Sequence, residues 1–155
     1  MNNLIETLRE NNLTIASVES LTGGLFASEL VSFPKASDVY LGSLVCYANV
    51  IKQDILKIDR KKIKKYGVVS KEIADLMAIK GQKLFNTNIS VSFTGNAGPD
   101  TLENKDLGLI YTSIKINDKL YSFKDKLSGS RNQIRKEIVA IVKTRLIKIL
   151  EEKGE

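Results

Sequence analysis

A serine stands where the chain is expected to change from a strand to a helix. Residues 18–24 (VESLTGG) lie between two apolar runs, of which the second begins at Leu25. At such a junction the first N–H groups of the helix lack partners within the helix and carry the positive end of its dipole. Ser20 beside these groups suits a nucleophile next to an oxyanion site, or a site for an anion such as phosphate. The ordinary alternative is that Ser20 or Thr22 caps the helix and that the glycines only form a turn.

The absence of one residue type narrows the possible chemistry. The 155 residues contain no histidine, which excludes the Ser-His-Asp triad, the Cys-His pair and every metal site built on histidine. A hydrolase with this composition takes its base from lysine, tyrosine or a carboxylate, and a serine with a lysine base is the main remaining form of nucleophilic catalysis. Lys52 is the candidate base, and Tyr47 could hold the lysine or pass a proton. The ordinary alternatives are a solvated lysine and a strand-end aromatic residue in the core.

The hydrophobic pattern predicts a layered α/β domain that contains these residues. Helices are expected over residues 2–11, 22–31, 50–58, 71–85 and 131–151, and strands over 13–18, 43–47, 89–93, 107–116 and 119–127. Asn117-Asp118 is a hairpin signal between the last two strands, so the sheet is expected to be mixed. The short apolar strand 43–47 is expected near the centre of the sheet. The lysine-rich segment that leads to Tyr66 is assigned no element.

Three loops follow the expected carboxyl ends of strands, after Val18, Tyr47 and Phe93. In open α/β sheets ligands bind at these ends, so the three loops should line one site. Its candidate residues are Ser20, Thr22, Gly23, Gly24, Tyr47, Asn49, Lys52, Thr94, Gly95, Gly98 and Asp100. Partial burial and the nearby positive helix end would both lower the pKa of Lys52, as a base requires. For Gly95 and Gly98 the ordinary alternative is a simple turn.

Composition also bounds the partners. The net charge of +6 comes from 24 basic and 18 acidic residues and is typical of a lysine-rich solvated surface. Aromatic residues do not interleave with the basic ones, so nucleic-acid binding is not expected. No apolar run approaches the roughly 20 residues of a membrane span, and the N-terminus lacks the regions of a signal peptide. Because Cys46 is the only cysteine, no internal disulfide is expected, which fits a cytoplasmic location.

Four motifs in the chain resemble, in the same order, those of the CinA C-terminal domain family. Residues 19–24 (ESLTGG) resemble its E-S-C-T-G-G signature, and residues 47–52 (YANVIK) resemble its Y-x-N-x-x-K element. Residues 94–100 (TGNAGPD) resemble its S-G-x-A-G-P segment, with Gly108 as the following glycine. Gly129, Arg131 and Arg135 resemble the G-x-R-x-x-x-R opening of its last helix. Together the motifs cover nearly the whole chain.

The resemblance implies a single domain over residues 1–155, a three-layer α/β/α sandwich with a mixed, mostly parallel sheet and one antiparallel hairpin. It also implies nicotinamide-nucleotide amidase activity, which converts nicotinamide mononucleotide into nicotinate mononucleotide and ammonia without a metal or another cofactor. Ser20 would be the acylated nucleophile, Lys52 its general base and Tyr47 the group that assists the lysine. A homodimer is implied as well.

The resemblance further implies the groups that hold the substrate. Backbone N–H groups near Thr22, Gly23 and Gly24 would form an oxyanion hole or bind phosphate. The site would be lined by Asn49, Thr94, Gly95, Gly98 and Arg131, of which Arg131 suits phosphate as a planar donor.

The chain departs from the family pattern in two places. Leu21 replaces the cysteine of the first motif, where a neighbour of the nucleophile need only pack. Residues 100–108 (DTLENKDLG) lack a glycine and a proline of the family loop, so substrate contacts from this loop are left open. The alternative function is a catalytically inactive member that binds a nucleotide or a partner protein.

Overall fold

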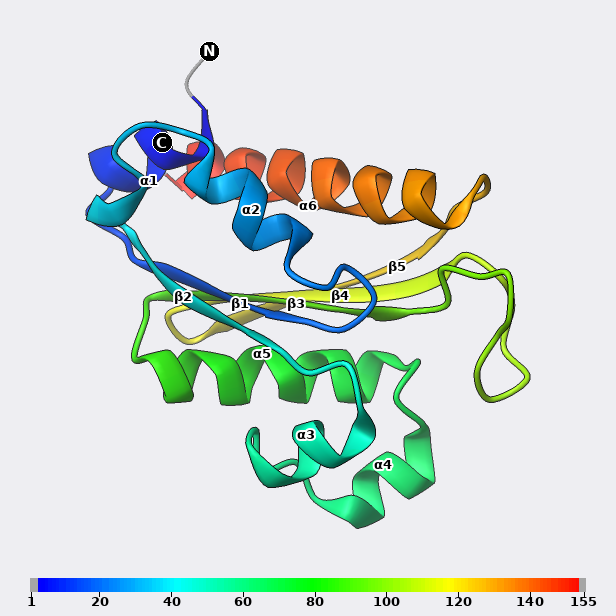
Figure 1. The fold of residues 1–155 in the computed structure, drawn as a ribbon. Helices are drawn as coiled ribbons and strands as arrows, with labels where there is room; N and C mark the ends of the chain where they lie inside the picture. The colour runs from blue at the N-terminus through cyan, green and yellow to red at the C-terminus, as the bar shows by residue number, and fades with distance from the viewer. Residues whose placement is uncertain (1–2, 154–155) are drawn as a thin grey trace.

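The computed structural model describes residues 3–153. Its strands are β1 (Ile15–Glu19), β2 (Tyr40–Val45), β3 (Ile89–Gly95), β4 (Leu109–Ile116) and β5 (Lys119–Lys126). Its helices are α1 (Leu4–Glu10), α2 (Leu25–Val31), the 3-10 helix η1 (Ala36–Asp38), α3 (Asn49–Asp54), α4 (Arg60–Tyr66), α5 (Lys71–Phe85) and α6 (Arg131–Lys153) (Figure 1). No helix within residues 3–153 combines the length and the apolar character that crossing a bilayer requires.

The strands form one mixed sheet in the order β2-β1-β3-β4-β5. β1 pairs in parallel with β2 and with β3, whereas β4 pairs antiparallel with β3 and with β5. Four of the five strands therefore run in the same direction, and β4 alone runs against them. The hairpin turns at Asn117 and Asp118, where Asn117 has a φ of 49°, as a two-residue turn of this kind requires. The predicted mixed sheet with one hairpin is confirmed.

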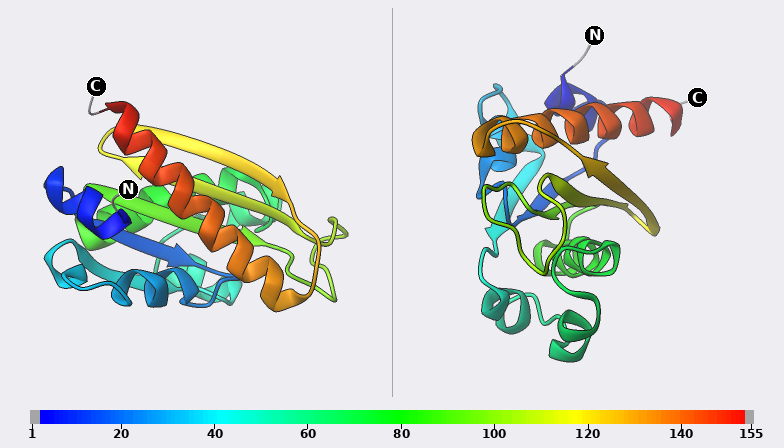
Figure 2. Two further views of the ribbon diagram at one scale, coloured as in Figure 1. Left: turned by 90° about the horizontal axis from the view of Figure 1, so that it is seen from above. Right: turned by 90° about the vertical axis from the view of Figure 1, so that its right-hand side faces the viewer.

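Helices cover both faces of the sheet, which confirms the three-layer α/β/α arrangement. α1, α2 and α6 lie on one face and α5 lies on the other, with α3 and α4 beyond it (Figures 1 and 2). The first face buries an apolar cluster that includes Ile15, Val91 and Ile138. On the second face small side chains let α5 lie close: a Cβ added to Gly81 would be 2.3 Å from a methyl group of Val18.

Two elements differ from the prediction. β2 lies at the edge of the sheet and not near its centre, and Leu41 and Val45 on it are exposed. A short apolar run is compatible with either position, since the sequence alone does not show whether a neighbouring strand pairs on one side of it or on both. The lysine-rich segment forms helix α4, because the side chain of Asp59 caps its first turn and Ile63 is buried against α5 and its neighbours.

Several boundaries also shift. The helix expected over 22–31 begins at Leu25, and the one expected over 50–58 runs from Asn49 to Asp54. The helix expected over 2–11 is described from Leu4 to Glu10, while Asn2 lies outside the described residues. Ser70 caps α5 as expected, its hydroxyl accepting a hydrogen bond from the N–H of Ile73.

Candidate active site

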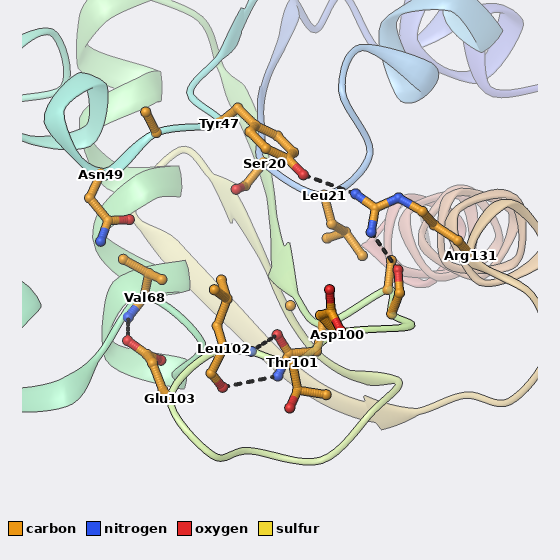
Figure 3. Close-up of a pocket in the computed structure, with 15 residues that line it drawn as sticks. Ser20, Leu21, Tyr47, Asn49, Val68, Asp100, Thr101, Leu102, Glu103 and Arg131 are labelled. Carbon is orange, nitrogen blue, oxygen red and sulfur yellow. Dashed lines mark hydrogen bonds between the residues drawn. The ribbon is translucent and has the colours of Figure 1, made fainter.

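The carboxyl ends of β1, β2, β3 and β5 lie at the same end of the sheet. From β1 the chain passes over α2 to β2 on one side, and later through α5 to β3 on the other side. Ligands of open α/β sheets bind at such a reversal of strand order. The loop after β3 and the start of α6 lie at this same end (Figure 1). A cavity of about 520 Å³ opens there, and its wall includes Ser20, Tyr47, Asn49, Asn96, Glu103 and Arg131 (Figure 3).

Ser20 and Lys52 meet beneath this cavity. The Nζ atom of Lys52 lies 3.1 Å from the Oγ atom of Ser20, and Nζ also donates a 2.7 Å hydrogen bond to the carbonyl oxygen of Cys46. Ser20 itself is held by its N–H, which donates to the carbonyl of Phe93 on β3 at 3.0 Å. A neutral amine can donate to Cys46 and accept the Ser20 proton at the same time. The arrangement therefore suits a serine nucleophile with a lysine base.

Burial of Lys52 favours the neutral amine that a base requires. Its side chain is 1% exposed, and this burial lowers the pKa of the amine from its ordinary value of 10.5. The charges of Cys46 and Glu103 act in the opposite direction but weigh less. Burial disfavours the ammonium because the low-dielectric interior solvates a charge poorly. The structure thus replaces the ordinary interpretation of a solvated lysine with a buried one in contact with the serine.

Glu19, the residue before Ser20, supplies the cap of α2, so that Ser20 does not. Its buried carboxylate accepts hydrogen bonds from the N–H groups of Phe26 and Ala27 in the first turn of α2, at 3.0 and 3.1 Å. The residue at the N-cap position is Gly24, which has no side chain to offer. Glu19 therefore caps α2 in its place. Ser20 therefore does not cap α2, and the N–H groups of Phe26 and Ala27 are not available to a phosphate.

The turn after Ser20 contains three N–H groups without an acceptor. The N–H of Gly23 donates to the carbonyl of Ser20 at 3.1 Å, and the N–H of Leu25 donates to the carbonyl of Thr22. In the described part of the chain, the N–H groups of Leu21, Thr22 and Gly24 have no acceptor. Of these three residues, Leu21 lines the cavity, whereas Thr22 is fully buried. The N–H of Leu21 is therefore the candidate donor for an oxyanion on a group attached to Ser20.

Tyr47 contacts Arg131 across the cavity mouth. An Nη2–H of Arg131 donates to the Tyr47 hydroxyl at 2.9 Å, and Nη1 donates to the carbonyl of Gly98 at 2.5 Å (Figure 3). Tyr47 is 62% exposed, so it is not the core aromatic of the ordinary interpretation. Among the contacts described for residues 3–153, none is a hydrogen bond between Tyr47 and Lys52. Tyr47 therefore contacts the guanidinium of Arg131, and its assistance to Lys52 stays a prediction.

The loop between β3 and β4 is fixed at three points. The Asn96 side chain accepts from the N–H of Leu102 at 2.9 Å and holds the interior of the loop. Glu103 accepts from the N–H groups of Val68 and Val69 at 2.8 and 3.0 Å, just before α5. Lys105 donates to the carbonyl of Tyr66 and lies 3.4 Å from Glu103.

The remaining predicted residues fall into three groups. Gly95, Gly98 and Asp100 line the cavity with Ser20, Tyr47, Asn49 and Arg131, while Lys52 lies behind Ser20. Thr22 and Thr94 are buried outside the cavity wall, and the Thr94 hydroxyl donates to the carbonyl of Val68. Gly23 and Gly24 form the turn, with φ angles of 58° and 98°. Within residues 3–153 no group of three or more acidic or cysteine side chains is placed to hold a metal.

Sequence reasoning missed the roles of Glu19, Asn96 and Glu103. Glu19 stands in the first motif, but nothing in that motif indicates that its carboxylate caps the next helix. Asn96 and Glu103 look like ordinary loop residues. Asn96 bonds to backbone atoms of its own loop, and Glu103 bonds to residues that are distant in the sequence. No spacing in the sequence indicates either contact.

Comparison with known proteins gives a consistent picture. A model of the CinA C-terminal domain family matches residues 1–150. A protein of Bacillus mycoides (strain KBAB4) is 40% identical over 149 residues, which are 96% of this chain and 36% of that protein. One of Bacillus pumilus (strain SAFR-032) is 38% identical over 147 residues, 95% of this chain and 35% of that protein. Both are named as competence-damage inducible proteins. This chain spans about a third of the length of the curated relatives it matches.

Solved structures share the fold. A competence-damaged protein (CinA) superfamily protein from Klebsiella pneumoniae 700603 superposes with a TM-score of 0.93 at 18% identity, over 96% of this chain and 94% of that one. The competence/damage inducible protein CihA from Agrobacterium tumefaciens superposes with a TM-score of 0.83 at 27% identity, over 100% of this chain and 98% of that one.

Proposed function

Because the chain belongs to the CinA C-terminal domain family, we propose that it is an amidohydrolase that deamidates nicotinamide mononucleotide to nicotinate mononucleotide and ammonia. One observation carries the proposal: the buried Nζ of Lys52 lies 3.1 Å from the Oγ of Ser20, at the wall of a cavity large enough for a mononucleotide. A buried lysine with a lowered pKa next to a serine hydroxyl is costly to maintain in a purely structural role.

In the first half of the reaction, neutral Lys52 takes the proton of Ser20 as Oγ attacks the carboxamide carbon. The negative charge moves to the amide oxygen, and the N–H group of Leu21 at the cavity wall is a donor available to it. The Lys52 ammonium then gives its proton to the leaving nitrogen. The C–N bond breaks, ammonia departs, and Ser20 holds the acyl group as an ester.

In the second half, water attacks the ester carbon and gives a proton to Lys52. The C–O bond to Ser20 breaks, the proton returns to Oγ, and the carboxylic acid leaves and ionises. No step needs an oxidant or a reductant. Arg131 at the cavity mouth has the planar donor geometry that a phosphate group prefers. Its contact with Tyr47 keeps the guanidinium at that position before a substrate arrives.

The test is ammonia release from nicotinamide mononucleotide by the purified protein, with and without a chelator. Ser20→Ala should abolish turnover with little change in melting temperature, because Ser20 does not cap α2. Ser28→Ala, an exposed serine of α2, is the matched control and should keep full activity. Turnover that survives in Ser20→Ala would refute the mechanism. Binding of the nucleotide without turnover in the unmodified protein would favour the inactive, nucleotide-binding alternative.

A further inference from the structure

The guanidinium of Arg135 reaches from α6 to the turn that follows Ser20. Its Nε donates to the carbonyl of Leu21 and its Nη2 donates to the carbonyl of Thr22, each at 2.9 Å. The remaining nitrogen, Nη1, donates to the side chain of Asn132 at 3.0 Å. Arg135 is separated from the turn by more than 110 residues, so these contacts exist only in the folded domain.

These bonds fix the orientation of consecutive peptide units. In a trans peptide the C=O and N–H of one unit point in opposite directions. Since the carbonyl of Thr22 accepts from Arg135, the N–H of Gly23 in the same unit points away from the guanidinium, and it donates to the carbonyl of Ser20. The unit that contains this carbonyl also contains the N–H of Leu21, which is therefore directed away from Gly23. Arg135 thus orients the free N–H of Leu21 through two successive hydrogen bonds.

The turn is shaped to admit the guanidinium. Gly23 has a φ of 58°, and a Cβ at this position would lie 3.3 Å from the Nη2 of Arg135. A side chain at position 23 would strain the backbone and crowd the arginine. The planar fork of arginine matches two neighbouring carbonyls, whereas a lysine ammonium is a single point. The glycine at position 23 and the arginine at position 135 are thus the residue types that this contact requires.

We propose that Arg135 is a positioning residue of the amidase reaction, one that holds the N–H group of Leu21 in the orientation that stabilises the oxyanion. This inference rests on the proposed function. Arg135 does not touch the substrate; it acts through the backbone of the turn. Its loss removes stabilisation that exists only in the transition state, so kcat falls while substrate binding is kept.

Steady-state kinetics with matched arginine variants test this role. In Arg135→Gln we expect kcat to fall roughly 100-fold with KM within about threefold, the size found for loss of an oxyanion donor. Arg135→Lys keeps one bond and should lie between that variant and the unmodified protein. Arg145→Gln is the control, because Arg145 on the same helix makes two hydrogen bonds to Asp125. It should keep kcat and KM even if the melting temperature falls.

A second readout separates this inference from the substrate assignment. A fluorophosphonate probe reacts when Ser20 Oγ attacks phosphorus: the O–P bond forms, the P–F bond breaks, fluoride leaves and Lys52 takes the proton. The phosphoryl oxygen then needs the same N–H donor. Arg135→Gln should slow this labelling, followed by intact mass, by a factor similar to the fall in kcat. If nicotinamide mononucleotide is not hydrolysed, the substrate assignment fails but the labelling rates still decide the role of Arg135.

Two results would overturn the positioning role. One is equal labelling rates for Arg135→Gln and the unmodified protein, measured below the melting temperature of the variant. The other is an unmodified protein whose Ser20 does not react with the probe at all. A melting temperature that falls while kcat and labelling stay constant would make Arg135 a structural residue only.

Discussion

The carboxylate of Glu19 lies 3.0 Å from the backbone nitrogen of Phe26, at the first turn of α2. It also accepts hydrogen bonds from the N–H of Ala27 and the hydroxyl of Ser17. The cap of the helix is therefore supplied by the residue directly before Ser20. This leaves the Ser20 hydroxyl to Lys52 alone.

Glu19→Gln should lower the free energy of unfolding by about 1–2 kcal/mol, because an amide has one acceptor oxygen where two N–H donors and a hydroxyl need acceptors. Chemical denaturation measures this loss. Glu29→Gln is the control on the same helix, since the ion pair of Glu29 with Lys143 is partly exposed and should contribute less than about 1 kcal/mol. Equal stability of Glu19→Gln and the unmodified protein would argue against the capping role.

The rate of deamidation should rise with pH as Lys52 loses its proton. Burial lowers the pKa of Lys52 below its ordinary value of 10.5, so the neutral amine becomes the main form at a lower pH than for a lysine in water. The rising limb of kcat against pH should consequently lie below 10.5. Lys52→Arg should be inactive at every pH, because guanidinium stays protonated and cannot accept the serine proton.

Lys62→Met, an exposed lysine of α4, is the control for a lost positive charge and should keep the pH profile. A rising limb that stays unchanged in an active Lys52 variant would assign it to another group.

Tyr47→Phe separates two roles for the tyrosine. Because its hydroxyl accepts from Arg131, we expect KM for the mononucleotide to rise by roughly fivefold, the effect of one lost hydrogen bond. We expect kcat to change by less than about twofold. A large fall in kcat at constant KM would instead return Tyr47 to the role of assisting Lys52, as the family resemblance implies.

Glu103→Gln should loosen the loop between β3 and β4. The carboxylate accepts from two N–H groups before α5, and an amide can serve only one of them as an acceptor. We expect faster proteolysis of residues 100–107 and a KM raised by roughly three- to tenfold, since this loop forms part of the cavity wall. Asp106→Asn is the control in the same loop: its ion pair with Lys126 is exposed and should matter little.

Much of the fold could be predicted because burial imposes a period on the sequence. α5 shows this most clearly, since one of its faces is buried and its boundaries are those expected. β3 begins at the expected residue although both of its faces are buried. The prediction that β2 lies near the centre of the sheet was wrong, because a short apolar run does not reveal whether a neighbouring strand covers both of its edges. α4 was missed because its lysines are exposed and only Ile63 is buried, too few apolar positions to show a helical period.

The candidate site was predictable in part. The absence of histidine made a serine with a lysine base the main nucleophilic pair that remained, and the structure brings Ser20 and Lys52 together. The contact of Tyr47 with Arg131 could not be predicted, since it joins residues 84 positions apart. The same holds for Arg135, whose partners are carbonyl oxygens. Every residue has such an oxygen, so no sequence pattern distinguishes the two that are used.

The oxygen that receives the second hydrogen bond of Lys52 belongs to the main chain of Cys46. Exchange of the side chain at position 46 cannot delete this acceptor; only a change in the path of the backbone can. A single point mutation can therefore remove Ser20 or Lys52, whereas the acceptor at position 46 persists as long as the backbone keeps its path. A variant of this chain that lacks both side chains but keeps the fold would retain this acceptor, so that restoring Ser20 and Lys52 would restore all three groups.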